Sequence, residues 1–288
     1  NLPCPFPDAW YAVCHSAELA PGCIRNETVC GHQLVVWRER SEEGRVSILD
    51  AYCPHLGAHL GVGGCVVGGK KGGIECPFHK WRFDVDGKVV WTPAVEMYGD
   101  RLPPSQANAF KYPVLERSGT IFVWMTIAKK AVVGTRWEGF EYPPLWEVPS
   151  FDLKSWRYDG VTEHVVHATL QECPENGADV AHLPSLHGSF LLSIGQGLLE
   201  HEWEATWEGK PPSRKKLTWI TNPAPAAKFG ERGIHLPGFS VRVRICQAGP
   251  AVVFIRLHTA LGPVMIIETV RPVAPMRLVT RHAAFAPP

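Results

Sequence analysis

Two stretches, Cys53-Pro54-His55-Leu56-Gly57 and Cys76-Pro77-Phe78-His79-Lys80-Trp81, decide the fold of the first half of the chain. Each stretch follows a strand-like segment and supplies one cysteine and one histidine from a proline-containing turn. The candidate ligands of a metal centre are two thiolates and two imidazoles, from Cys53, His55, Cys76 and His79. The sequence therefore predicts that the two turns face each other across that centre.

Tetrahedral zinc is the main alternative occupant, since two Cys and two His also suit a structural zinc site. A classical zinc finger places Cys with Cys and His with His along the chain, whereas here each turn supplies one of each. A cluster with thiolates on one iron and imidazoles on the other needs two such mixed turns. We therefore predict a [2Fe–2S] cluster. We expect the backbone to approach its bridging sulfurs closely at Gly57, Gly61, Gly63 and Gly64.

The sequence around these turns predicts a small all-β domain over residues 1–126. Short strand patterns are separated there by Gly, Pro, Asp or Asn, and Asp86-Gly87 predicts a hairpin turn. The expected strands are Ala9–His15, Gln33–Arg38, Arg45–Tyr52, Val89–Thr92 and Thr120–Trp124. The glycine- and lysine-rich run 68–73 should form a surface hairpin tip. Cys65 should be an ordinary thiol, and Trp81 should pack over the cluster region without a chemical role.

Residues 127–288 show a mixed pattern that predicts a second domain of the α+β class with an antiparallel sheet. A segment from Glu163 to about Gly188 contains the most helix-compatible stretch, with interruptions at Pro174 and Pro184. The expected strands are His201–Trp207, Leu217–Thr221, Phe239–Cys246, Ala251–Thr259 and Val264–Val270. Glycine–proline turns at 248–250 and 261–263 should join the last three strands into an antiparallel meander.

The composition excludes several classes of partner. The 288 residues carry a formal net charge of +1 and no block of like charge, so a nucleic-acid partner is not expected. No apolar run reaches the roughly 18 residues of a membrane span. Because the sequence begins at Asn1, a membrane anchor could precede it. The nine cysteines are scattered, which favours metal ligation and free thiols in a reducing compartment over a disulfide framework.

A second candidate site lies in residues 175–187. Oxygen-activating non-haem iron takes two imidazoles and one carboxylate on one face, with open positions opposite. Asp179 and His182 are three residues apart and share a face if this segment is helical, with Asn176 one turn earlier. His187 would miss that face on a straight helix, and a bend at Pro184 would bring it round. His164 and His167 lie near this segment, and we interpret them as structural.

The two turns resemble the Rieske signature, and the pattern Cys-Pro-Phe-His-x-Trp-x-Phe-Asp of residues 76–84 resembles its oxygenase branch. Rieske proteins of respiratory complexes carry an extra cysteine in each turn, which forms a disulfide beside the cluster. The matching positions here are Ala58 and Lys80, so no such disulfide is expected. Lys80 also occupies a position that is usually glycine in this family.

The pattern Asn-x-x-Asp-x-x-His-x-x-x-x-His of residues 176–187 resembles the Rieske mononuclear-iron oxygenases. The resemblance implies that His182 and His187 bind mononuclear Fe(II). It implies that Asp179, with Asn176 beside it, links that iron to a Rieske histidine of a neighbouring subunit. It further implies a homotrimer and a helix-grip-like α+β catalytic domain for residues 127–288.

Within this family the chain is most similar to the Neverland-type cholesterol 7-desaturases, relatives of the ketosteroid hydroxylases. The likeness rests on Pro5-Phe6-Pro7-x-x-Trp10-Tyr11, on Glu175–Leu183 and on Thr269–Pro275. It implies removal of hydrogens at C7 and C8 of cholesterol, with O2 and electrons that come from NAD(P)H through a reductase. It also implies an intracellular full-length protein associated with the endoplasmic reticulum membrane.

The family's third iron ligand, a downstream aspartate, would fall beyond Pro288. We therefore expect a C-terminally truncated catalytic domain that does not oxidise sterol in this form. Glu268 is the one late carboxylate considered as a replacement, although a solvent-facing strand position is the expectation for it. Three hypotheses stay open: a sterol desaturase or 3-ketosteroid hydroxylase, a plain Rieske electron carrier, and a truncated inactive relative.

Overall fold

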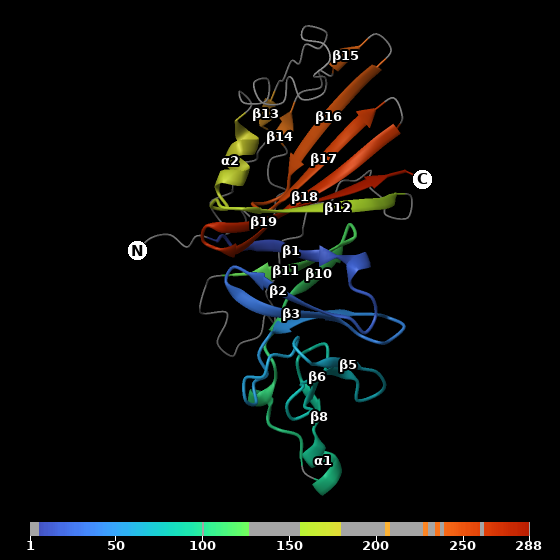
Figure 1. The fold of residues 1–288 in the computed structure, drawn as a ribbon, viewed down its shortest axis with the longest axis vertical. Coiled ribbons are helices and arrows are strands. Elements are labelled where there is room, and N and C mark those ends of the chain that lie inside the picture. The colour runs from blue at the N-terminus through green and yellow to red at the C-terminus, as the bar shows by residue number, and fades with distance from the viewer. Residues whose placement is uncertain are drawn as a thin grey trace, which may run out of the picture. The chain divides into compact units, whose positions relative to one another are not determined.

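The computed structural model describes residues 6–99, 101–126, 156–179, 205–207, 227–229, 234–236, 239–259 and 262–287. The chain divides into two compact units, Tyr11–Met125 and Asn1–Trp10 with Thr126–Pro288. Each unit is described by itself (Figure 1). The domain division at residue 126 stays a prediction. No helix in the described parts of the chain is long and apolar enough to cross a membrane.

The unit Tyr11–Met125 is built from small antiparallel sheets, as the alternation of short strands and turn residues predicts. One three-stranded sheet has the order β1 (Ala9–His15), β11 (Thr120–Met125), β10 (Val114–Arg117). A four-stranded sheet has the order β2 (Ile24–Val29), β3 (His32–Arg38), β4 (Val46–Asp50), β9 (Lys111–Tyr112). The other four-stranded sheet has the order β5 (Cys65–Val67), β6 (Gly73–Glu75), β7 (Arg82–Phe83), β8 (Val89–Trp91). A short helix, α1 (Pro93–Tyr98), follows.

The expected strands of this unit are all present, with ends that differ by at most two residues. The predicted hairpin at Asp86-Gly87 joins β7 to β8, and Gly87 has a φ of 75° in the turn. The run 68–73 joins β5 to β6 as an antiparallel hairpin. The lysines at its tip are exposed, so the surface-hairpin prediction is confirmed.

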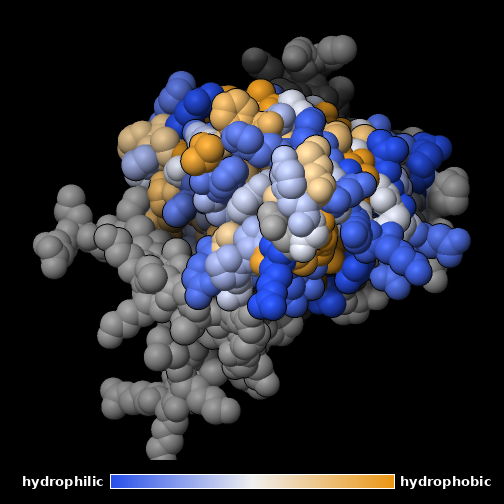
Figure 2. Space-filling view, turned by 90° about the horizontal axis from the view of Figure 1, so that it is seen from below, coloured by the Kyte–Doolittle hydropathy of each residue, from blue (hydrophilic) through white to orange (hydrophobic). Residues whose placement is uncertain are grey.

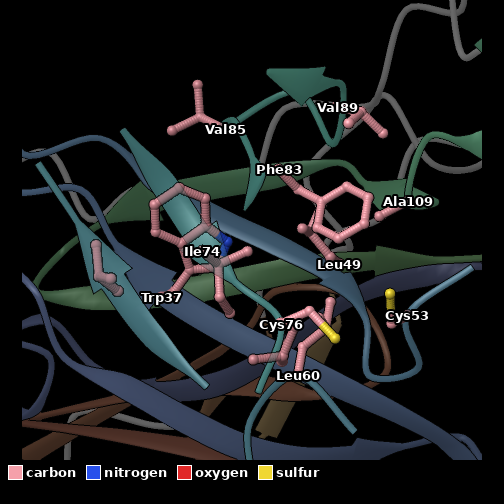
Figure 3. Packing of buried hydrophobic residues seen from close by; sticks show 12 residues of the cluster. Trp37, Leu49, Cys53, Leu60, Ile74, Cys76, Phe83, Val85, Val89 and Ala109 are labelled. Carbon is pink, nitrogen blue, oxygen red and sulfur yellow. The ribbon is translucent and has the colours of Figure 1, made fainter. Parts of the chain in front are cut away.

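The core of this unit reaches the two candidate cluster turns. Trp37, Leu49, Ile74 and Phe83 are fully buried and belong to one packed group. Cys53 and Cys76 belong to the same group, each with 2 % of its surface exposed. Figure 3 shows the two sulfur atoms in the lower half of this packing. The two thiols are therefore part of the hydrophobic core.

The second unit contains a six-stranded antiparallel sheet, with two further strands and one helix described beside it. The sheet order is β12 (Arg157–Val166), β19 (Arg277–Ala286), β18 (Gly262–Ala274), β17 (Val252–Thr259), β16 (Phe239–Gln247), β15 (Ile234–Leu236). A separate pair joins β13 (Ala205–Trp207) to β14 (Ala227–Phe229), and α2 covers Glu172–Ala178. The meander of β16, β17 and β18 is confirmed, with Ile245 opposite Ile255 and Ile255 opposite Ile266.

The segment that was predicted to contain a helix begins with strand residues and continues with a short helix. The segment from Glu163 to Val166 is the end of strand β12, because it pairs with β19 and carries the β-branched Val165-Val166. The described helix is only Glu172–Ala178, and Pro174 lies in its first turn, where the ring is tolerated. Strand β19 was not predicted. The expected strand Leu217–Thr221 lies outside the described residues.

Candidate metal centres

The first candidate turn connects β4 to β5 and closes on itself. The Gly57 N–H donates to the Cys53 carbonyl at 2.8 Å, and the Cys53 N–H donates to the Ala58 carbonyl at 2.8 Å. Gly57 has a φ of 74°, the left-handed conformation that glycine adopts without strain. The turn therefore reverses the chain within six residues and leaves His55 between its two ends.

The second candidate turn connects β6 to β7 and repeats the same backbone pattern. The Lys80 N–H donates to the Cys76 carbonyl at 3.2 Å, and the Cys76 N–H donates to the Trp81 carbonyl at 2.8 Å. Lys80, with a φ of 60°, takes the place that Gly57 has in the first turn. The two turns are thus one structural element used twice.

The thiols of Cys53 and Cys76 form the buried half of the site. They are close enough for a hydrogen bond between the two side chains, and the backbone N–H groups of His55 and Leu56 donate to the Cys53 sulfur. Burial raises the pKa of the Cys53 thiol to about 11, the neighbouring Cys76 adds to this, and the two N–H donors partly offset it. A metal that binds here displaces the thiol protons and pairs with the sulfurs.

The imidazoles of His55 and His79 form the exposed half of the site. Their ring centroids are 4.9 Å apart, with the planes at 75°. Trp81 stacks on His55 with centroids 4.3 Å apart and planes at 9°, and the Phe78 ring meets His79 edge to face at 4.9 Å. Trp81 therefore packs directly against a candidate ligand from the other turn.

The donor set fits a cluster with two chemically different irons. The two thiols make one pair in the core and the two imidazoles make another pair at the surface. Such a division into a thiolate side and an imidazole side is what a Rieske-type [2Fe–2S] cluster requires.

Cys65, by contrast, is exposed and forms no disulfide. Among the described residues, no three His, Cys, Asp or Glu side chains gather around one point.

The surface around the exposed imidazoles is partly apolar. Leu56 and Phe78, the neighbours of the two histidines in the sequence, have 64 % and 67 % of their surfaces exposed. Val62 is exposed to a similar degree. Figure 2 shows hydrophobic and hydrophilic residues interspersed on the face of the described residues seen from below.

The glycines near the first turn serve the packing of the chain itself. A Cβ at Gly64 would collide with the backbone carbonyl oxygens of Leu60 and Glu75. A Cβ at Gly61 would collide with the Asn26 side chain, whose amide donates to the Gly61 carbonyl at 2.9 Å. The structure thus gives a physical reason for these two glycines that differs from the predicted approach to the cluster sulfurs.

The second candidate site is only partly described. Asn176 lies on α2 and is exposed, while α2 ends at Ala178. Asp179 caps the helix, with its N–H donating to the Glu175 carbonyl at 3.0 Å. Asp179 is therefore the first residue after α2, and the shared face with His182, which was expected only if the segment is helical, is not tested by the described residues. The predicted ligands His182 and His187, together with Pro184, lie outside the described residues.

Glu268 has a partner in the sheet. It lies on β18 directly opposite His282 of β19, and the two side chains approach to 3.7 Å. Only 26 % of the Glu268 side chain is exposed, so the solvent-facing position expected for it is wrong. The Glu268 carboxylate accepts a hydrogen bond from the His282 imidazole and so raises the pKa of His282 above its ordinary value. The His164 ring lies 6.0 Å from that of His282.

Comparison with known protein families identifies the first unit. The profile of the Rieske [2Fe-2S] domain matches residues 9–109, which include both cluster turns. Solved structures share the fold of the whole chain. Dicamba monooxygenase bound to dicamba matches with a TM-score of 0.66 and 18 % identity, over 97 % of this chain and 77 % of that one. Pseudomonas putida CBB5 NdmB matches with a TM-score of 0.65 and 16 % identity, over 99 % of this chain and 78 % of that one.

Two curated desaturases match nearly the whole chain, and a third relative matches part of it. Cholesterol 7-desaturase nvd of Xenopus laevis is 37 % identical over 99 % of this chain and 60 % of its own length. Cholesterol 7-desaturase of Caenorhabditis elegans is 38 % identical over 94 % of this chain and 62 % of its own length. A probable 3-ketosteroid-9-alpha-monooxygenase oxygenase component of Rhodococcus rhodochrous is 32 % identical over 62 % of this chain and 40 % of its own length. The chain spans about three fifths of the desaturases that it matches.

Proposed function

Because residues 9–109 match the Rieske [2Fe-2S] domain and the chain is similar to cholesterol 7-desaturases, we propose that it belongs to the Rieske non-haem iron oxygenases and carries the metal sites of an enzyme that oxidises a sterol. The proposed reaction is 7-desaturation of cholesterol with O2 and with electrons from NAD(P)H, delivered by a reductase. Support for the sterol comes from the names of the relatives in Xenopus laevis and Caenorhabditis elegans.

The proposed ligands of the [2Fe–2S] cluster are Cys53 and Cys76 on one iron and His55 and His79 on the other. When bound, the cluster accepts one electron at a time and passes it on. The thiol pair lies in the core and would be shielded from water, whereas the imidazole pair is exposed. Electrons would therefore enter and leave on the side of the histidines.

The proposed ligands of the mononuclear iron are His182 and His187, with Asp179 and Asn176 beside them. When bound, that iron supplies oxygen activation. Asp179 is exposed at the end of α2, and His55 and His79 are exposed on the other unit. A carboxylate of one chain could thus accept a hydrogen bond from a cluster imidazole of a neighbouring chain, and the proposed assembly is a homotrimer.

One observation carries the proposal for the cluster. Two turns with the same backbone pattern bring two buried thiols together and two exposed imidazoles together. The test is electron paramagnetic resonance of protein purified without oxygen, with iron and sulfide analysis. We expect a Rieske-type signal and about two irons per cluster. Cys76→Ser should abolish the signal, while the matched variant Cys65→Ser, at an exposed thiol, should keep it. Zinc in place of iron, with no iron–sulfur absorption, would refute the assignment.

Turnover is the test of the substrate. A protein extended to the full length of the desaturase relatives, a reductase, NAD(P)H and cholesterol are incubated, and mass spectrometry follows loss of two hydrogens from the sterol. Hydroxylation of a 3-ketosteroid is the second candidate, favoured by the Rhodococcus rhodochrous relative, and its product would gain one oxygen. A protein that shows the Rieske signal, accepts electrons and converts neither steroid would refute the oxidising role and leave an electron carrier or an inactive relative.

A further inference from the structure

Lys80 adopts a backbone conformation that side chains rarely occupy. Its φ of 60° lies in the left-handed region, where a Cβ is unfavourably close to the following carbonyl. Gly57, the residue with the same hydrogen-bond position in the first turn, reaches a φ of 74° without that cost. Outliers of this kind point to a role for the residue that bears them.

The Lys80 side chain takes part in a charge network beside the cluster turn. Its ammonium lies 3.4 Å from a carboxylate oxygen of Glu75, the residue that precedes Cys76. Glu75 is nine-tenths buried, and the Arg82 guanidinium donates to its other oxygen at 2.8 Å. Arg82 is itself fixed over the Trp91 ring, 4.1 Å from the centroid.

Arg82 alone suffices to pair with the Glu75 carboxylate, since it is closer and less exposed than Lys80. Lys80 therefore leaves one positive charge in excess at the base of the turn that carries Cys76 and His79. A positive charge near a redox centre favours its reduced form, because reduction adds an electron to that centre.

We infer that Lys80 is a positioning residue that raises the reduction potential of the cluster and holds the second cluster turn through Glu75. This inference rests on the proposed cluster ligands. It gives a reason for a lysine at a position where glycine would be less strained. A lysine with a merely structural role would affect stability and leave the potential unchanged.

Three variants separate charge from backbone strain. Lys80→Asn removes the charge, and asparagine tolerates the left-handed conformation. Lys80→Gly removes both the charge and the strain. Lys80→Arg keeps both. Lys70→Asn is the matched control, because it removes the charge of another exposed lysine. Lys70 lies at the tip of the β5–β6 hairpin, at the end opposite Glu75.

The measurement is the midpoint potential of the cluster-loaded protein, from a redox titration followed by electron paramagnetic resonance. For Lys80→Asn and Lys80→Gly we expect the equilibrium constant for reduction to fall about threefold. This corresponds to a midpoint potential lower by about 28 mV, since a one-electron couple shifts by about 59 mV for each tenfold change in that constant. Lys80→Arg and Lys70→Asn should stay close to the wild type. Thermal unfolding of Lys80→Gly should occur at a higher temperature than that of Lys80→Asn.

An unchanged potential in Lys80→Asn would overturn the inference, while the wild-type Rieske signal would still support the proposed function. A fall in Lys80→Arg as large as that in Lys80→Asn would also overturn it, because the charge would then not be the cause. If the wild type itself gives no Rieske signal, the proposed cluster ligands are wrong and the inference is overturned with them.

Discussion

Replacement of Trp81 by alanine should loosen the imidazole half of the cluster site. The indole stacks on His55 at 4.3 Å with nearly parallel planes, so the substitution removes the whole stacked face. Aromatic pairs of this kind contribute about 1 kcal/mol beyond the area that they bury. A tenfold change in an equilibrium constant corresponds to about 1.4 kcal/mol. The loss therefore corresponds to roughly a fivefold weaker retention of the cluster, because retention depends on the orientation of His55.

The assay is the rate at which the cluster is lost after dilution into a chelator, followed by its visible absorption. We expect Trp81→Ala to lose the cluster about fivefold faster than the wild type, since a freely rotating His55 binds iron less well. Trp81→Phe, which keeps an aromatic face, should lie between the two. The control is Tyr98→Ala, which removes an aromatic ring with 76 % of its surface exposed on α1 of the same unit. Equal rates for Trp81→Ala, Tyr98→Ala and the wild type would refute the reasoning.

Three further results are expected. Gly64→Ala should destabilise the first unit by roughly 3 kcal/mol in urea unfolding, because its Cβ meets two backbone carbonyls that cannot both retreat; an unchanged midpoint would contradict this. His282→Gln should remove a contribution of less than about 1 kcal/mol to the free energy of unfolding. That contribution is fully present below pH 6.5 and is lost as the pH rises through the raised pKa of His282. A difference in unfolding free energy between wild type and variant that grows with pH would contradict this sign. In a protein extended to the full length of the desaturase relatives, Asp179→Asn should stop the proposed sterol turnover while both metals stay bound, and full activity in that variant would exclude Asp179 from the electron path.

The candidate cluster residues can be picked out from the sequence alone because the members of each pair are close together along the chain. Each turn places a cysteine and a histidine within a few positions, and the strands before them alternate in a pattern that sequence alone reveals. The near-equivalence of the two turns was not predictable. It depends on the φ of Lys80, and a lysine in the sequence gives no sign of a left-handed backbone.

The second unit was harder to predict because its order depends on distant pairings. Strand β12 pairs with β19, with His164 opposite Thr280, so more than one hundred residues separate the partners. The end of β12, from Glu163, lies in the segment that was predicted to contain a helix. Pairing with β19 decides its structure, because tertiary pairing overrides local preference. The contact of Trp81 with His55 is of the same kind, since two turns must first fold before the rings can stack.

The burial of Cys53 and Cys76 in the core has a consequence for the order of assembly. The same packed group contains Trp37, Leu49 and Phe83, so closing the core and enclosing the thiols are one event. A cluster delivered after that event would meet the exposed imidazoles first and would have to open the packing to reach the sulfurs. We therefore expect the cluster to be inserted before or during folding of this unit. A cluster supplied later should enter only at the rate at which the core opens by local unfolding.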